Sequence, residues 1–529
     1  MTIMGKTLLT LLMLSSVFSI ASSRRRSSST NIDWWCNQTP HPEPCKYYMK
    51  QRHYSHRLKH RSEFRAILIH LALERALVMQ RQARDLGQNN ITKKKKSVFR
   101  DCLKLYDNTV FHLNRTLQGL HVKRSCSPFD AQTWLSTART NIETCQNGAL
   151  ELGVLAFISS TERSNVTEII SNGLFVNWGF LKHEKVHYTE DTEEGFPSWF
   201  SMHERKLLEG SSIRAHVVVA KDGSGHFRSV QAAINAAARR RFKTRFIIHV
   251  KRGVYRENIE VDKTNDNIML VGDGMRNTII TSGRSVQAGF TTYSSATAGI
   301  DGLHFIARDI TFKNTAGPMR GQAVALRSAS DLSVFYRCSI EGYQDTLMVH
   351  AQRQFYRGCY IYGTVDFIFG NAAVVFQNCV LLVRRPLSGQ ANMITAQGRD
   401  DPFQNTGISI HNSQIRPAPD FRPVAHNFNT FLGRPWQRYS RVVVMKTFLD
   451  GFVSPMGWSR WGDSNFALNT LFYGEFKNFG PGSSTRNRVR WPGFHVIRSP
   501  TEASQFTVSN LLAGRTWLPA TGVPFTSGL

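Results

Sequence analysis

The chain has 529 residues, which is long for one domain, and its 41% apolar and 11% aromatic content is that of a globular protein, which excludes a disordered chain. Lys and Arg number 66 against 38 Asp and Glu, for a net charge of +28. Such an excess attracts a polyanion, and the kind of polyanion depends on the compartment in which the protein works.

The first 23 residues have the pattern of a secretory signal. Lys6 precedes an apolar run over 8–20, and the small residues 21–23 follow it, so we predict a signal peptide over 1–23. The run is shorter than the roughly 20 residues that a membrane span needs. Arg24 to Arg26 keep an uncleaved signal anchor as the alternative. A secreted basic protein meets acidic polysaccharide, so we expect no nucleic-acid partner.

Two features of the first third agree with secretion. Four Asn-x-Ser/Thr triplets lie there and predict glycosylation at Asn37, Asn90, Asn114 and Asn165. Such triplets also arise by chance, but their clustering indicates that this region has a different surface from the rest. The eight cysteines of the chain can form disulfides in an oxidising compartment.

Residues 34–180 are predicted to form a helical domain. The apolar residues of its first long segment recur at the spacing of an amphipathic helix: Phe64, Ile67, Leu68 and Leu71. Residues 62–86 contain no Pro or Gly, and two further helical stretches cover 98–120 and 129–146. The basic run from Lys93 to Lys96 is predicted to be a solvated helix end or loop.

A polar linker is predicted over 181–212. It contains an acidic patch and the tetrapeptide Arg205-Lys206-Leu207-Leu208. A dibasic site in an exposed linker is a natural target for proteolysis, although the segment can also be a linker and nothing more.

The region from 213 to 529 is predicted to be a parallel β-helix. Short β-rich runs alternate there with Gly, Asn and Asp. Three segments align at a period of about 20 residues and end at Cys338, Cys359 and Cys379: Phe335-Tyr-Arg-Cys, Phe355-Tyr-Arg-Gly-Cys and Phe376-Gln-Asn-Cys. A repeat of this length indicates a solenoid, and the leucine-rich and propeller signatures are absent.

The same period predicts a polar column. Asp345 and Asp366 are one coil apart, and Gln322 and Gln344 fall beside them. Two neighbouring carboxylates cannot both ionise at low cost, so one becomes a proton donor and the other a base or nucleophile. Amide side chains beside them can stabilise an oxyanion. The pattern fits a hydrolase, and the alternative is a set of solvated residues at a coil edge.

Five motifs occur in order around these residues, at Gly253-x-Tyr-x-Glu, Gln322-Ala-Val-Ala-Leu, Gln344-Asp-Thr-Leu, Asp366-Phe-Ile-Phe-Gly and Leu432-Gly-Arg-Pro-Trp. Together they resemble the plant pectin methylesterases, from about Val217 to the end of the chain. The resemblance implies a right-handed parallel β-helix and the hydrolysis of methyl esters of pectin to pectate and methanol.

The resemblance also implies roles for individual residues. Asp366 is expected to be the nucleophile and Asp345 the general acid and base, while Gln344 stabilises the transition state. The expected substrate-binding residues are Thr292, Gln322, Arg434 and Trp436. The family needs no cofactor and no metal, and the histidines at 304 and 350 are expected to be structural or solvated. One departure is Met348, where the family usually has Tyr at the cleft border, and this change concerns affinity or subsite preference.

The first third resembles the pectin methylesterase inhibitors through Cys36-x8-Cys45, Asp101-Cys-Leu-x-Leu-Tyr and Trp134-Leu-Ser-Thr-Ala followed by Asn141-x-x-Thr-Cys. This family is a four-helix bundle with a helical hairpin before it. The resemblance implies the disulfides Cys36–Cys45 and Cys102–Cys145, and it leaves Cys126 unpaired. In the catalytic part it favours Cys359–Cys379, with a ladder of free thiols that includes Cys338 as the alternative.

These resemblances set the remaining expectations. A plant wall or apoplastic monomer is expected, whose partners are methylesterified pectin, a subtilisin-like protease that cuts after Leu208, and separate inhibitor proteins. The helical domain is expected to inhibit the enzyme or to retain it during secretion. Two competing interpretations are a pectin depolymerase on the same fold, for which no calcium cluster is found near Asp345, and a non-catalytic wall-binding protein.

Overall fold

The computed structural model describes residues 32–52, 58–87, 91–121, 126–158, 165–182, 214–241 and 244–529. The predicted signal peptide, the triplet at Asn90 and the predicted processing site at 205–208 lie outside these residues. Among the described residues, no helix is long and apolar enough to cross a membrane.

The described part of the N-terminal third is helical, as predicted. A short hairpin of two helices precedes the four long helices of a bundle, and one 3-10 turn follows α5: α1 (Ile32–Asn37), α2 (Pro42–Gln51), α3 (Arg61–Asp85), α4 (Lys93–His121), α5 (Pro128–Glu151), η1 (Leu155–Ile158) and α7 (Val166–Leu181). The basic run 93–96 forms the first turn of α4, so the prediction of a helix end is confirmed. The apolar stripe of α3 packs into the bundle through Phe64, Leu68 and Leu71.

The start of α5 is fixed by its own sequence. Ser127 is the N-cap, and its hydroxyl accepts a hydrogen bond from the backbone N–H of Asp130 at 3.0 Å. The carboxylate of Asp130 accepts the N–H of Ser127 at 3.1 Å, and Pro128 occupies the first turn. This reciprocal capping satisfies N–H groups that a helix start would otherwise leave unpaired, so α5 begins at a defined residue.

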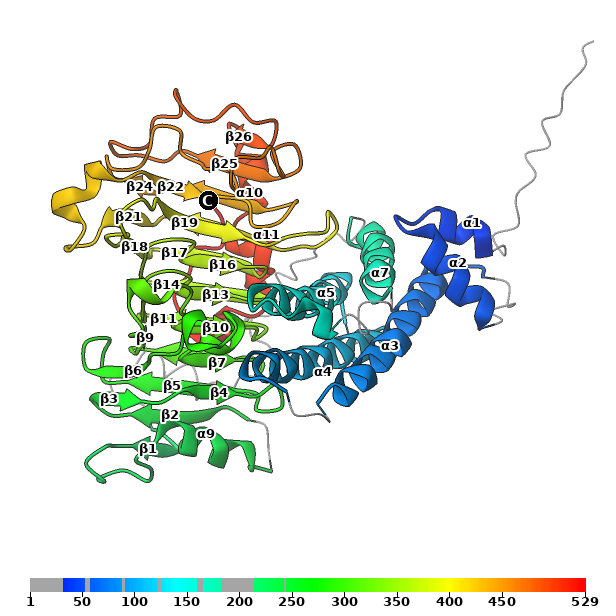
Figure 1. The fold of residues 1–529 in the computed structure, drawn as a ribbon, viewed down its shortest axis with the longest axis horizontal. Helices are drawn as coiled ribbons and strands as arrows, with labels where there is room; N and C mark the ends of the chain where they lie inside the picture. Colours follow the sequence, from blue (N-terminus) through cyan, green and yellow to red (C-terminus); the bar gives the residue numbers. More distant parts are fainter. Residues whose placement is uncertain are drawn as a thin grey trace, which may run out of the picture.

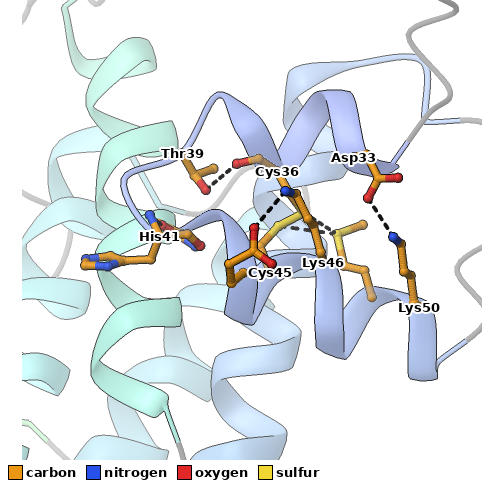
Figure 2. The surroundings of a disulfide bond; sticks show 10 residues. Asp33, Cys36, Thr39, His41, Cys45, Lys46 and Lys50 are labelled. Atoms are coloured by element: carbon orange, nitrogen blue, oxygen red, sulfur yellow. Dashed lines mark hydrogen bonds and ion pairs between the residues drawn. A yellow bond between two sulfur atoms is a disulfide. The ribbon is translucent and has the colours of Figure 1, made fainter.

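Two disulfides staple the helical domain. Cys36–Cys45 joins α1 to α2, and Figure 2 shows it beside the ion pair of Asp33 and Lys50. Cys102–Cys145 joins α4 to α5. Both pairings agree with the prediction, and Cys126 is a buried free thiol.

The C-terminal part is a parallel β-helix whose coils contribute strands to three sheets. The eleven-stranded sheet contains β1 (Val217–Val219), β2 (Phe246–Val250), β5 (Ile268–Gly272), β8 (Ile306–Arg308), β11 (Ser333–Tyr336), β14 (Arg353–Arg357), β17 (Ala373–Gln377), β20 (Gly407–His411), β23 (Arg441–Met445), β25 (Phe472–Phe476) and β26 (Phe494–Val496). The seven-stranded sheet contains β4 (Ile259–Val261), β7 (Ala298–Ile300), β10 (Leu326–Ser328), β13 (Leu347–Val349), β16 (Ile368–Gly370), β19 (Asn392–Gln397) and β22 (Thr430–Gly433). The eight-stranded sheet contains β3 (Gly253–Arg256), β6 (Thr278–Ser282), β9 (Thr311–Asn314), β12 (Ser339–Glu341), β15 (Tyr360–Gly363), β18 (Val380–Val383), β21 (Gln414–Pro417) and β24 (Phe448–Leu449).

Short helices complete this domain. They are α9 (Val230–Ala238), α10 (Pro500–Ser504), α11 (Val508–Leu512) and the 3-10 turns η2 (Val286–Ala288), η3 (Tyr293–Ser295), η4 (Pro318–Arg320), η5 (Arg422–Asn427), η6 (Gly514–Thr516) and η7 (Pro519–Thr521). The C-terminal helix α11 packs against the outer face of the eleven-stranded sheet through Leu511 and Leu512.

Stacked aromatic rings mark the coil repeat inside the solenoid. Phe335 pairs with Tyr356, and Tyr356 pairs with Phe376, with ring centroids 4.6 and 4.7 Å apart. The predicted repeat is therefore present. The prediction aligns Phe355 with Phe335 and Phe376, and this alignment is off by one residue. Phe355 pairs with Val334 and points to the outer face of the sheet.

The predicted Cys359–Cys379 bond is wrong, and the alternative ladder of buried thiols is what the structure contains. The thiol of Cys359 donates to the carbonyl of Phe335 at 3.2 Å, and the thiol of Cys379 donates to that of Tyr356 at 3.5 Å. Each sulfur is thus hydrogen-bonded to the backbone of the preceding coil, and neither is part of a disulfide.

Candidate active site

The two predicted catalytic carboxyls lie at the same position of neighbouring coils. Leu347 pairs with Ile368 in the parallel ladder, and Asp345 and Asp366 each come two residues before their member of that pair. The N–H of Asp345 donates to the carbonyl of Val365 at 3.0 Å, which ties the two coils together at this corner. Both aspartates are buried and have a positive φ, of 59° and 50°. Non-glycine residues rarely adopt this conformation, and it occurs preferentially in turns and functional sites.

Arg434 distinguishes the two carboxyls. Its Nε donates to Oδ1 of Asp366 at 2.9 Å and its Nη2 donates to Oδ2 at 2.6 Å, which is a bidentate pair. Burial raises the pKa of Asp366, but the hydrogen bonds and charge of Arg434 oppose that rise. Burial raises the pKa of Asp345 well above its usual range, and the charges of Asp366 and Glu151 add to it. Arg434 therefore favours the ionised form of Asp366, whereas the surroundings of Asp345 favour its protonated form.

These aspartates open into a cleft of about 440 Å³ that contains every predicted site residue. Its wall includes Thr292, Gln322, Gln344, Arg434 and Trp436. The ladder offset between β10 and β13 is 21 residues, which places Gln322 level with Tyr343. Gln322 is therefore two residues out of register with Asp345, and both residues line the same cleft, as the polar column predicted.

The cleft also contains aromatic and apolar residues that sequence reasoning did not assign. Met348 pairs with Phe369 on the floor, so the departure noted in the sequence lies inside the cleft. The ring of Trp461 lies 4.4 Å from the guanidinium carbon of Arg434. The coil period could have identified Phe369 from Met348. Trp461 comes from an irregular segment after β22 and has no periodic signal.

The two histidines noted in the sequence are not part of a metal site among the described residues. No group of three or more His, Cys, Asp or Glu in the described ranges is placed to hold a metal. Burial lowers the pKa of His350 to about 3 and that of His304 to about 4, so both rings are neutral structural groups. Nε2 of His350 lies 2.8 Å from the hydroxyl of Thr144.

Comparison with known proteins assigns both parts of the chain. The Pectinesterase family model matches residues 216–515. The chain belongs to the pectinesterase family. The model described as plant invertase/pectin methylesterase inhibitor matches residues 30–176, which is the helical part.

Relatives and solved structures resemble the chain over long stretches. A probable pectinesterase/pectinesterase inhibitor 33 of Arabidopsis thaliana is 59% identical over 95% of this chain and 87% of its own length. Pectinesterase 2 of Citrus sinensis is 51% identical over 97% of this chain and 98% of its own. The structure of pectin methylesterase from carrot is 55% identical, with a TM-score of 0.58, over 60% of this chain and all of its own.

The inhibitor-like domain packs onto the face of the β-helix that carries the site. Figure 1 shows the bundle on one side of the solenoid, with α4 and α5 reaching the seven-stranded sheet and the α1–α2 hairpin lying farthest away. Five residues of the last two turns of α5 help to line the catalytic cleft: Thr144, Asn147, Gly148, Leu150 and Glu151. Sequence reasoning missed all five.

Hydrogen bonds, ion pairs and apolar contacts hold this interface. Polar residues of α5 at every fourth position meet the pectinesterase domain: Gln132 at Phe403, Ser136 at Asn405, Thr140 at Asn371 and Thr144 at His350. Ion pairs lie around this row. Lys104 of α4 contacts Asp301 and Glu260 at 2.7 Å each. Apolar contacts also cross the boundary, such as Phe175 of α7 against Phe403 with ring centroids 5.1 Å apart, so the interface is mixed.

The three described glycosylation candidates are accessible. Asn37, Asn114 and Asn165 are all exposed on the helical domain. Glycosylation at these positions stays a prediction.

Proposed function

We propose that the chain is a secreted plant wall enzyme that hydrolyses the methyl esters of pectin to pectate and methanol. The observation that carries the proposal is the bidentate Arg434–Asp366 pair beside a second buried carboxyl, Asp345, in one open cleft. The relatives named pectinesterase and the carrot pectin methylesterase support the same reaction.

The proposed reaction has two steps. A carboxylate oxygen of Asp366 attacks the C6 carbonyl carbon of an esterified galacturonate, and the protonated Asp345 gives its proton to the departing methoxide oxygen. This releases methanol and leaves an acid anhydride between Asp366 and the sugar carboxyl. Asp345, now ionised, takes a proton from water as the water oxygen attacks the anhydride. The free acid leaves and both aspartates return to their starting states.

The remaining cleft residues would position the substrate. The amides of Gln344 and Gln322 would donate to the oxyanion of each tetrahedral intermediate. The ring of Trp436 would stack on a sugar, and Thr292 would contact a neighbouring unit. Arg434 keeps Asp366 ionised and fixes its orientation, because the two N–H groups match the two carboxylate oxygens.

Substitution of each aspartate tests this mechanism. We expect Asp366→Asn and Asp345→Asn each to lower kcat for methanol release by at least about 100-fold. Asp420→Asn is the matched control, because Asp420 also lies near an arginine, 3.5 Å from Arg384, but is exposed and outside the cleft. A folded Asp366→Asn enzyme with near-normal methanol release would contradict the proposed nucleophile.

We also propose that the inhibitor-like domain keeps the uncut chain latent. The α5 residues in the cleft occupy space that a polysaccharide needs. In one chain the helical domain acts at an effective concentration that reaches millimolar for short flexible linkers. A subtilisin-like protease would cut after Leu208 and release a mature enzyme that begins near Glu209. Separate inhibitor proteins could then bind the vacated face.

Blocking the cut separates latency from a role in secretion. Arg205→Ala with Lys206→Ala should leave the chain intact and lower methanol release, with secretion measured in parallel. An uncut chain as active as the mature enzyme would eliminate autoinhibition and leave retention during secretion as the role of the domain.

A further inference from the structure

Two carboxyl groups of the inhibitor-like domain hold two adjacent threonines at the edge of the cleft. The hydroxyl of Thr291 donates to Asp101 of α4. The next residue, Thr292, donates its backbone N–H to Oε2 of Glu151 at 2.8 Å and its hydroxyl to Oε1 of the same side chain. Both oxygens of Glu151 are thus bound at a position that lines the catalytic cleft.

The position of Glu151 is unfavourable for its own helix. It is the last residue of α5, where the helix dipole favours a cation, and the last turn of α5 has no basic residue. Burial raises the pKa of its carboxyl. Its negative charge also contributes to the raised pKa of Asp345, so it lies close to the catalytic carboxyls. The hydrogen bonds that its carboxylate accepts come from Thr292, outside the helical domain.

The backbone of α5 approaches the threonine pair closely. A Cβ built on Gly148 would lie 3.2 Å from Cγ2 of Thr291, which is tighter than ordinary van der Waals contact. A glycine one turn before Glu151 therefore lets the end of α5 reach the floor of the cleft. The adjacent residue Leu150 stays 64% exposed, so the contact is made by the acid and not by an apolar anchor.

Thr292 offers two hydrogen-bond donors to the carboxylate of Glu151, which is a planar group whose two oxygens share a negative charge. The free acid group of a galacturonate unit is the same chemical group, whereas its methyl ester has no charge and carries a bulkier oxygen. Hydrogen bonds to charged groups are stronger than neutral ones, so the site discriminates between the acid and the ester.

From this geometry we infer that Glu151 is an internal substitute for the free carboxylate of pectin, which occupies the Thr292 site in the uncut chain. The inference rests on the proposed function and specifies how that site is regulated. It has a consequence beyond simple covering of the cleft. De-esterified pectin, which is the product of the reaction, competes with Glu151 for Thr292, while fully esterified pectin does not.

The test uses the full-length chain with the linker cut blocked, carrying Glu151→Gln or no further change. The probe is a short, fully de-esterified oligogalacturonate, which is not a substrate, and its binding is measured by calorimetry. We expect Glu151→Gln to bind the probe about 10- to 100-fold more tightly than the parent, which is the strength of charged hydrogen bonds. Glu43→Gln is the control, because Glu43 is an exposed acid of α2 that pairs with Lys46.

Each outcome decides the inference. Tighter binding by Glu151→Gln alone supports it. Equal binding by the parent and Glu151→Gln, or an equal gain in Glu43→Gln, overturns it. The chain with an unaltered linker, cut there, is measured beside these variants. If the cut chain releases no methanol, the proposed function has failed. If it releases methanol and binds the probe while Glu151→Gln changes nothing, only the role of Glu151 has failed.

Discussion

Replacement of Arg139 by alanine should loosen the contact between the two domains. Arg139 lies on α5, and its Nε donates to Oδ2 of Asp400 in the pectinesterase domain at 2.9 Å. The same guanidinium lies 3.9 Å from Asp401 and donates through Nη1 to the carbonyl of Thr167 at 2.9 Å. The side chains of Arg139, Asp400 and Asp401 are only 15%, 12% and 4% exposed, so the variant leaves two buried carboxyls without the charge of Arg139.

The size of the expected loss of affinity between the domains follows from the burial of these side chains. Removal of one partner from a buried ion pair costs about 3–5 kcal/mol, and residual exposure of Arg139 and Asp400 favours the lower end. In the separated domains Asp400 and Asp401 are hydrated, so the cost appears as lost affinity. About 3 kcal/mol corresponds to roughly a 100-fold higher dissociation constant. If the effective concentration of the helical domain in the uncut chain is about 1 mM, a rise of the dissociation constant from about 10 µM to about 1 mM would open half of the uncut chains.

The assay follows methanol release by the linker-cut chain upon dilution, which gives the dissociation constant of the helical fragment. Arg100→Ala is the control, because Arg100 is an exposed arginine of α4. A dissociation constant for Arg139→Ala within twofold of the parent would refute the reasoning that this buried pair holds the domains together. A parallel rise in Arg100→Ala would show that net charge, and not the pair, is responsible.

Three further results are expected. Arg434→Gln removes the group that opposes the raised pKa of Asp366. Because the nucleophile must be ionised, the acid limb of kcat against pH should move to higher pH, and an unmoved limb would refute this. Trp461→Leu should lower kcat by about 2- to 30-fold by loss of the cation–π contact with Arg434, and Trp461→Phe should restore most of it. Residues 209–529 hold 37 Lys and Arg against 20 Asp and Glu, so added salt should weaken retention on partly de-esterified pectin, and salt-independent binding would contradict this.

The coil period predicted the fold because each coil repeats the same burial pattern. Phe335 and Phe376 are spaced by two coils, and their rings stack on the intervening Tyr356. The period fails where a coil carries a long excursion. Phe376 pairs with Ile410 on the next coil, and the two residues are much farther apart in the sequence than one period of about 20 residues. The extra length consists of irregular segments that have no alternation of apolar and polar residues. The alignment error at Phe355 has a related cause, because Phe355 and Tyr356 are both aromatic and only one of them faces the interior.

The site was predictable to the extent that it follows the ladder. Asp345 and Asp366 could be found from their one-coil separation, and Arg434 from the motif that it shares with a known family. Trp461 could not, because an irregular chain segment brings it over Arg434. Glu151 could not either, because only docking of the second domain places an acid from α5 at Thr292.

The polar row on α5 explains why the docking itself could not be read from the sequence. Gln132, Ser136, Thr140 and Thr144 recur at every fourth residue, a spacing that predicts one face of a helix, and their polarity predicts a face toward water. The structure instead buries this face against the β-helix, and hydrogen bonds satisfy it there. The choice has a physical reason if the chain is cut between its domains, as we propose. Interfaces between partners that separate are more polar than permanent ones, because each surface must stay soluble alone. A row of hydroxyls and amides loses little when water replaces the partner, whereas an apolar row would leave an aggregating patch on both products. The same residues that hide the interface from sequence analysis therefore suit the release of the inhibitor-like domain that we propose.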